Sequence, residues 1–145
     1  EVEFLLAEAT ERGIAVGGGS AASHYNAAIT ASLKDWNVPA SDIATYLLRT
    51  DVSYATAAVK WQQKIGEQSW IALFNRGFEA WTSYRRLDFP VLKVPTVTFG
   101  DIKEVPKRYT YPGAEETING TNLQAASALI NGGDKVTSKI FWDKF

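Results

Sequence analysis

The sequence predicts a mainly α-helical fold with an irregular C-terminal third. Apolar residues recur at steps of three and four through residues 1–89, which is the period of helices with one buried face. The pattern then changes, because four prolines fall between Pro90 and Pro112 and no helical period remains. We therefore expect residues 90–145 to be extended chain and turns, with one short helix and at most short strands.

Composition supports a folded protein and excludes several functional classes. Of the 145 residues, 46% are hydrophobic and 12% are aromatic, which is enough to build a buried core. The net charge is −1, so no basic excess is present to neutralise nucleic-acid phosphates. No stretch approaches the roughly 20 apolar residues of a membrane-spanning helix. The lack of cysteine excludes disulfides, thiolate metal sites and a cysteine nucleophile.

The start of the chain predicts that it is a portion of a longer protein. The first ten residues, EVEFLLAEAT, already follow a helical pattern without a capping residue or a signal-peptide pattern ahead of them. Methionine is absent, even at position 1. We expect residues 1–145 to form a single unit within that longer chain.

The first two helices are predicted from their spacing and their ends. Gly13 is expected to end the first helix. The sequence VGGGS (16–20) follows as a turn, and Ser20 or Ser23 is placed to cap the second helix. The apolar positions are Val2, Leu5, Leu6 and Ala9 in the first helix and Tyr25, Ile29, Leu33 and Trp36 in the second.

This helix pair carries a repeat-like spacing. Ala21, Tyr25 and Ala28 match the small–aromatic–small pattern in the second helix of a tetratricopeptide repeat. Any close helix pair requires small residues at such positions, so a single unit does not by itself establish a repeat protein.

Further helices are predicted along the chain. Ser41 or Asp42 can cap a third helix, Gly66 permits a break between the fourth and fifth, and Asn119 or Thr121 can cap a short helix near the C-terminus. The predicted ranges are 41–48, about 53–65, about 67–87 and about 121–130.

The fifth helix contains the aromatic segment WIALFNRGFEAWTSYRR (70–86). On a helical wheel of about 100° per residue, Trp70, Phe74 and Trp81 share a side, and the apolar arc widens to roughly 200°. So wide an arc is typical of a helix packed on two sides, which favours a buried core over a platform for stacking sugar rings. Gly77 would cost about 1 kcal/mol against alanine inside a helix, so it predicts the close approach of a neighbour.

Arg85 interrupts the apolar side of this helix. A guanidinium in that position needs a partner. We expect it to bond the C-terminal carbonyls of its own helix, to pair with a core carboxylate or to reach water. The alternative is that it binds an anionic or polyhydroxylated ligand.

Four segments resemble the SusD/RagB family of outer-membrane nutrient-binding lipoproteins. The segment IGEQSWIALFNRGFEAWTSYRRLDFPVL is similar to the family stretch Q-x-W-I-A-L-F-x-Q-G-x-E-A-W-x-x-W/Y-R-R-T-G-Y-P. The helix pair EVEFLLAEATERG and AASHYNAAITASLKDWNV, the segment VPKRYTYPGAEETINGTNLQAA and the terminal NGGDKVTSKIFWDKF resemble others in the same order. Departures occur at Arg76, usually glutamine, at Leu87 and Asp88, usually Thr-Gly, and at Phe141, usually tryptophan, which leaves the subgroup and its ligand open.

The resemblance implies both a fold and a role. Members of the family are mostly helical, with tetratricopeptide-like helix pairs packed against a more irregular region. A lipidated N-terminal cysteine anchors them to the outer-membrane surface, where they cover a SusC-like TonB-dependent transporter and help to import oligosaccharides or, in some members, peptides. This chain would be the C-terminal portion, without that cysteine, and the resemblance implies neither a catalytic group nor a cofactor.

Six residues are candidates for contacting a ligand. Glycan binding needs exposed aromatic faces for stacking and planar hydrogen-bonding side chains for hydroxyls. The aromatic candidates outside the fifth helix are expected to be the more exposed, and those after Pro90 lie on irregular chain, where binding residues often occur. The candidates are Trp36, Tyr54, Trp61, Arg85, Tyr109 and Tyr111.

The sequence disfavours catalysis and metal binding, and two alternatives to nutrient binding are kept. His24 is the only histidine, so neither a Ser-His-Asp arrangement nor a zinc cluster has enough partners. The pairs Glu115–Glu116 and Glu67–Glu79 are expected to be solvated charge rather than a glycosidase pair. The alternatives are a helical-repeat scaffold that binds only protein and a fragment of a carbohydrate-active enzyme.

Overall fold

The computed structural model describes residues 1–94, 96 and 102–143. The chain divides into two compact units, Glu1–Pro90 (unit 1) and Val91–Phe145 (unit 2), and each is described by itself. This boundary lies where the sequence loses its helical period. That residues 1–145 act as a single unit stays a prediction.

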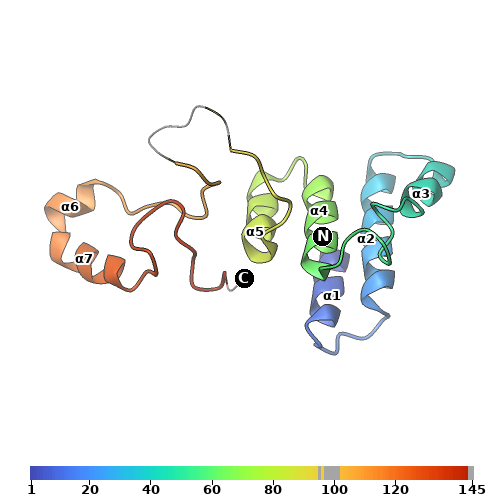
Figure 1. The fold of residues 1–145 in the computed structure, drawn as a ribbon, viewed down its shortest axis with the longest axis horizontal. Coiled ribbons are helices and arrows are strands. Elements are labelled where there is room, and N and C mark those ends of the chain that lie inside the picture. The colour runs from blue at the N-terminus through green and yellow to red at the C-terminus, as the bar shows by residue number, and fades with distance from the viewer. Residues whose placement is uncertain (95, 97–101, 144–145) are drawn as a thin grey trace. The chain divides into compact units, whose positions relative to one another are not determined.

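Unit 1 is built from helices that pack on their neighbours in turn. They are α1 (Val2–Glu11), α2 (Ala21–Asp35), α3 (Ala40–Leu47), α4 (Trp61–Ala72) and α5 (Gly77–Leu87). The helices α1 and α2 form a pair, α4 packs against both, α5 packs against α4, and α3 lies against α2 (Figure 1). The predicted mainly α fold is confirmed.

The core of unit 1 lies where α1, α2 and α4 meet. Tyr25 is fully buried, and its hydroxyl donates a hydrogen bond of 2.7 Å to the carbonyl of Val52. Burial raises the pKa of this tyrosine, so it remains a neutral donor. Ala21 and Ala28 are buried on either side of it, so the small–aromatic–small spacing does mark a packing face. The core residues are Phe4, Ala7, Tyr25, Ala28, Ile29, Val52, Ile65 and Leu87.

The ends of the first two helices follow the sequence closely. Gly13 has φ +76°, and the amide of Ile14 bonds to the carbonyl of Ala9 at 2.9 Å, which ends α1 in a left-handed turn. Ser20 caps α2, because its hydroxyl accepts a hydrogen bond from the amide of Ser23. Both expectations are confirmed.

The predicted apolar face of α1 is only partly right. Leu6 and Ala9 are half-buried, but Val2 and Leu5 are exposed. The buried residues of this helix are Phe4, Ala7 and the charged Glu8. The buried face of this helix therefore includes the carboxylate of Glu8, and the spacing of apolar residues cannot predict a buried charge.

The predicted helices over 53–65 and 67–87 are also wrong. Residues 53–60 form turns, and α4 begins at Trp61 and contains Gly66 in its interior. The helix predicted over 67–87 is interrupted at 73–76, so α4 and α5 are separate helices. They pack together, and a buried hydrogen bond of 3.0 Å joins the hydroxyls of Ser69 and Ser83. Gly77 opens α5, and nothing lies within 4 Å of where its Cβ would be, so the predicted close approach is absent there.

The third helix lacks the predicted side-chain cap. Pro39 stands at the N-cap position of α3, and Ser41 and Asp42 lie within the first turn. Asp42 there still favours the helix, because a negative charge interacts well with the free amides of a helix N-terminus.

Unit 2 contains two short helices, α6 (Ala114–Ile118) and α7 (Gly120–Ala128), and irregular chain. The helix α6 was not predicted. Asn119 precedes α7, but its side chain donates to Glu115 instead of capping α7. The amide of Lys107 bonds the carbonyl of Val136 at 2.7 Å, which joins the two irregular segments. The structure assigns no strand to the described part of this unit.

Candidate functional site

An open apolar groove lies at the junction of α4 and α5 in unit 1. It has a volume of about 730 Å³. Phe74 and Trp36 at its edge are 82% and 55% exposed, whereas Leu73 and Ala80 are buried. The residues of this aromatic groove are Trp36, Trp70, Ile71, Leu73, Phe74, Gly77 and Ala80.

The turn that ends α4 creates the groove. The amide of Phe74 bonds the carbonyl of Ile71 at 3.2 Å, and the amide of Arg76 bonds the carbonyl of Leu73 at 2.8 Å. The guanidinium of Arg76 also pairs with Glu1 at 3.1 Å, which ties the turn to the start of α1. The chain therefore changes direction within the aromatic segment, and Phe74 points into solvent instead of continuing a buried helical side.

Trp36 reaches the groove from the end of α2. The amide of Asn37 bonds the carbonyl of Lys34 at 2.9 Å, and the amide of Val38 bonds the carbonyl of Leu33 at 3.0 Å. Asn37 has φ +59°, and this left-handed turn is the usual way in which such a pair of bonds ends a helix. Trp36 is the last residue before the turn.

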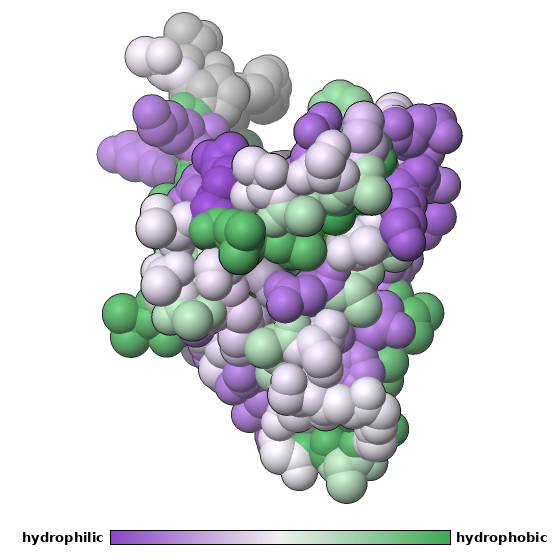
Figure 2. Space-filling model, turned by 90° about the vertical axis from the view of Figure 1, so that its right-hand side faces the viewer, coloured by the Kyte–Doolittle hydropathy of each residue, from purple (hydrophilic) through white to green (hydrophobic). Residues whose placement is uncertain are grey.

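The chemistry of the groove is almost entirely apolar. Its lining carries no charged side chain, and the indole N–H groups of Trp36 and Trp70 are the polar side-chain groups among its residues. The ring of Trp70 is half-buried and lies edge-on to Tyr84, with ring centres 6.2 Å apart. The groove can therefore stack a flat apolar face but supplies few hydrogen bonds to hydroxyls. By contrast, Figure 2 looks onto the α3 side of unit 1, where apolar and polar side chains are interspersed.

Two of the predicted ligand residues pack against the core. The ring centre of Tyr54 lies 5.0 Å from that of Tyr25, and its hydroxyl donates to Glu11. Burial, and next the bond to Glu11, raise the pKa of this hydroxyl. Trp61 is half-buried beneath the guanidinium of Arg12, 5.3 Å from the ring centre. Neither ring is the exposed platform that was expected.

Arg85 is engaged within its own helix. Its guanidinium lies 3.8 Å from the ring centre of Trp81, and its Nε donates to the carbonyl of Trp81 at 3.3 Å. A second nitrogen donates to the hydroxyl of Thr82 at 3.2 Å. Arg85 therefore bonds a carbonyl in the middle of its own helix, rather than the C-terminal carbonyls that were expected.

Tyr109 and Tyr111 lie on the irregular chain of unit 2. Tyr109 is 77% exposed. Tyr111 is held by its neighbours, because its amide bonds Asp134 at 3.1 Å and the guanidinium of Arg108 lies 5.4 Å from its ring centre. Arg108 in turn pairs with Asp134 at 2.6 Å. These contacts hold Tyr111 in place.

A second pocket, of about 700 Å³, lies within unit 2 and has a mixed lining. It is lined by Arg108, Lys139 and Asp143 together with apolar side chains that include the exposed Phe141. The carboxylate of Asp143 is buried and accepts a hydrogen bond of 3.0 Å from Lys139. Lys139 and Asp143 hold one another, and Arg108 is held by Asp134, so the pocket supplies fewer unengaged polar groups than its composition suggests.

The structure brings only part of the predicted site together. Trp36 meets Trp70 and Phe74, which the sequence had assigned to the core, while Tyr54 and Trp61 turn inward. The sequence FNRG (74–77) was the signal for the groove, because Asn and Gly within a helical pattern favour a turn. Among the described residues, no three His, Cys, Asp or Glu side chains gather as a metal site, and no helix is long and apolar enough to cross a membrane.

Comparison with known proteins identifies the family. Residues 1–112 match the SusD-like family described as starch-binding and associating with the outer membrane. Three solved structures are similar over 99% of this chain: a SusD-like protein of Bacteroidetes AC2a (28% identity, TM-score 0.84), a chitin-binding protein (29%, 0.75) and a SusD homologue of Bacteroides thetaiotaomicron VPI-5482 (25%, 0.76). The match covers 29%, 32% and 37% of those chains respectively, so this chain spans about a third of their length. No curated protein matches it. The aligned helices and the family match together show that the chain belongs to the SusD-like family.

Proposed function

We propose that this chain is part of a non-enzymatic binding protein that captures oligosaccharides, or peptides, at the outer-membrane surface. The match over residues 1–112 to a family described as starch-binding carries the proposal. The similarity to a chitin-binding protein over 99% of the chain supports a carbohydrate ligand. The protein would be a surface-exposed lipoprotein that delivers its ligand to a SusC-like TonB-dependent transporter.

Within this chain, Trp36 is the strongest proposed ligand contact. It stands beside Phe74 and Trp70 in the aromatic groove, where the apolar face of a pyranose ring could stack on the rings and its hydroxyls could reach the indole N–H groups. Tyr109 and Tyr111 are proposed contacts in unit 2. Tyr54, Trp61 and Arg85 already contact protein groups, so a ligand would have to displace those contacts.

The composition of the groove favours a second candidate function. A lining without charged side chains matches an apolar protein segment better than it matches a polyhydroxylated sugar. In that case the chain belongs to a helical scaffold that binds protein, such as the transporter, without contacting the nutrient.

Calorimetry with starch and chitin oligosaccharides separates these functions. We expect saturable binding by the protein that contains this chain, without release of reducing ends. If Phe74 stacks on a sugar ring, Phe74→Ala should weaken binding by about two- to tenfold, since an aromatic stack contributes about 0.5–1.5 kcal/mol. Phe78→Ala is the matched control, because Phe78 is an exposed phenylalanine of α5 that does not line the groove.

Each other outcome identifies a different function. Release of reducing ends would contradict the proposal and indicate an enzyme. Capture of a SusC-like transporter without affinity for any glycan or peptide would favour the scaffold. Glycan binding that both alanine variants leave unchanged would retain the proposed function and remove the groove from the site.

A further inference from the structure

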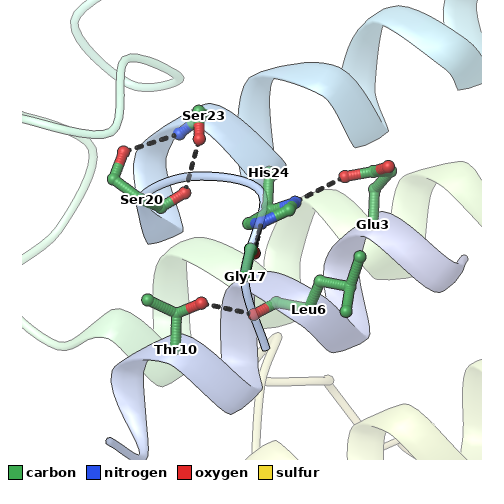
Figure 3. Close-up of polar contacts among 7 residues, drawn as sticks. All are labelled: Glu3, Leu6, Thr10, Gly17, Ser20, Ser23 and His24. Carbon is green, nitrogen blue, oxygen red and sulfur yellow. Dashed lines mark hydrogen bonds and ion pairs between the residues drawn. The ribbon is translucent and has the colours of Figure 1, made fainter. Parts of the chain in front are cut away.

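The only histidine of the chain joins three segments of unit 1. His24 lies in the first turns of α2, and its side chain is 9% exposed. Its Nδ1 lies 2.7 Å from the Glu3 carboxylate of α1, and its Nε2 lies 3.3 Å from the carbonyl of Gly17 (Figure 3). The imidazole thus sits between α1 and the connection that leads from α1 to α2.

Both partners of the ring are acceptors. An ionised carboxylate and a backbone carbonyl accept hydrogen bonds, and a neutral imidazole carries only one N–H. Both contacts can therefore be hydrogen bonds only when His24 is the doubly protonated imidazolium. In the neutral ring, one nitrogen must turn its lone pair toward an acceptor.

The connection depends on this contact. Gly17 and Gly18 have φ values of +71° and +81°, which glycine adopts without the steric cost that other residues bear. A Cβ on Gly18 would lie 3.4 Å from Cε1 of His24, so the ring packs closely against the glycine backbone. Residues 15–19 are exposed, and in the described structure the contact with His24 is the one hydrogen bond that these residues make.

We propose that His24 is a pH-sensitive latch, which when protonated holds the glycine-rich connection closed against α1 and α2. The charged group that faces His24 from α1 is Glu3. The connection contributes the backbone of Gly17 to Gly19. At the start of α2, the neighbouring Ser20 and Ser23 carry no charge (Figure 3). Loss of the ring proton removes one of the two hydrogen bonds. The Glu3 contact is the shorter, so Nδ1 keeps its proton and the carbonyl of Gly17 is released.

The direction of the pH dependence follows from the contacts. The hydrogen bond to Glu3 raises the pKa of His24 above its ordinary value of 6.5, against a smaller opposing effect of burial. For a raised pKa, the stabilisation is fully present below the ordinary value and is lost as the pH rises through the raised value. The latch is therefore closed in mildly acidic solution and opens toward alkaline pH.

Nuclear magnetic resonance of the protein that contains this chain can test the latch directly, with the ring ¹⁵N signals of His24 assigned through their connection to its backbone signals. We expect protonation with a midpoint above 6.5 and, above that midpoint, the tautomer with its proton on Nδ1. Glu3→Gln should lower the midpoint. A midpoint at or below 6.5, or a neutral ring protonated on Nε2, would overturn the proposal.

Limited proteolysis tests whether the connection opens. The cleavage rate within residues 14–20 should rise several-fold as the pH passes the midpoint measured for His24. The His24→Gln variant is the control, because it shows how the protease itself responds to pH. We expect this variant to be cleaved fast at every pH, with no pH dependence beyond that of the protease. Equal pH profiles for the two proteins would contradict the latch. Should His24→Gln fail to fold, the ring ¹⁵N measurement on the unaltered protein still decides.

Discussion

At the scale of single residues, a buried carboxylate organises unit 1. Glu8 is 5% exposed, and each of its oxygens is engaged by an arginine. Arg12 bonds one oxygen at 2.8 Å from the same helix, and Arg86 bonds the other at 2.9 Å from α5. Arg12 also covers the ring of Trp61, so this cluster joins α1, α4 and α5. A buried charge is tolerated here because both of its acceptor atoms are paired.

Glu8→Gln should destabilise the protein by about 2 kcal/mol. Breaking a buried ion pair costs about 3–5 kcal/mol, and the two arginines are about a third exposed, which reduces the loss through solvent screening. Urea denaturation measures the change. Glu79→Gln, at an exposed carboxylate of α5, should change stability by about 0.5 kcal/mol or less. Equal effects of the two substitutions would show that the cluster is not structural.

At the scale of helices, the packing of α4 depends on a glycine. A Cβ on Gly66 would lie 2.8 Å from the Cβ of Phe89 and 3.0 Å from its carbonyl oxygen. The chain that follows α5 therefore passes directly over the backbone of α4. The close approach that the sequence assigned to Gly77 occurs at Gly66 instead.

Gly66→Ala and Gly77→Ala should shift stability in opposite directions. Alanine at 66 gains about 1 kcal/mol in helix propensity, but the clash with Phe89 should outweigh that gain and give a net loss of about 1–2 kcal/mol. Alanine at 77 meets no neighbour, so we expect a gain of about 0.5 kcal/mol. Thermal denaturation of both variants gives the comparison. A stabilised Gly66→Ala protein would mean that Phe89 does not approach α4 this closely.

Local signals in the sequence predicted the end of α1 and the start of α2, and long-range contacts explain why the prediction of α4 and α5 failed. Gly13 and Ser20 act through atoms within a few residues, so their roles can be read from the sequence. The pairing of Arg76 with Glu1 supports the turn at 73–76. The hydrogen bond between Ser69 and Ser83 supports the contact of α4 with α5. A helical wheel contains no information about partners so distant in sequence.

The candidate site was only partly predictable for the same reason. Trp36 was expected to be exposed because it lies outside the fifth helix, and it is exposed. Phe74 was assigned to the core because a continuous helix would place it beside Trp70 and Trp81. Once the turn separates α4 from α5, Phe74 lies on a corner and forms the edge of the groove.

At the scale of the whole molecule, unit 1 combines a closed core with an open apolar surface. The core around Tyr25 is buried and hydrogen-bonded, whereas Phe74, Phe78 and Ile71 are all more than half exposed. Exposed apolar surface of this kind marks interaction sites in folded proteins. The account therefore requires the aromatic groove to be accessible to a ligand or a partner in solution.

Thiol labelling measures that accessibility directly, because residues 1–145 contain no cysteine and the unsubstituted protein gives the background reaction. Phe74→Cys adds one thiol at the edge of the groove, and Ala80→Cys adds one at a buried position on its floor. In the protein that contains this chain, we predict that the thiol at 74 reacts with a small disulfide reagent at nearly the rate of an unfolded peptide, and that the thiol at 80 reacts far more slowly. Equal and strong protection at both positions would show that the groove is covered, and would contradict the account.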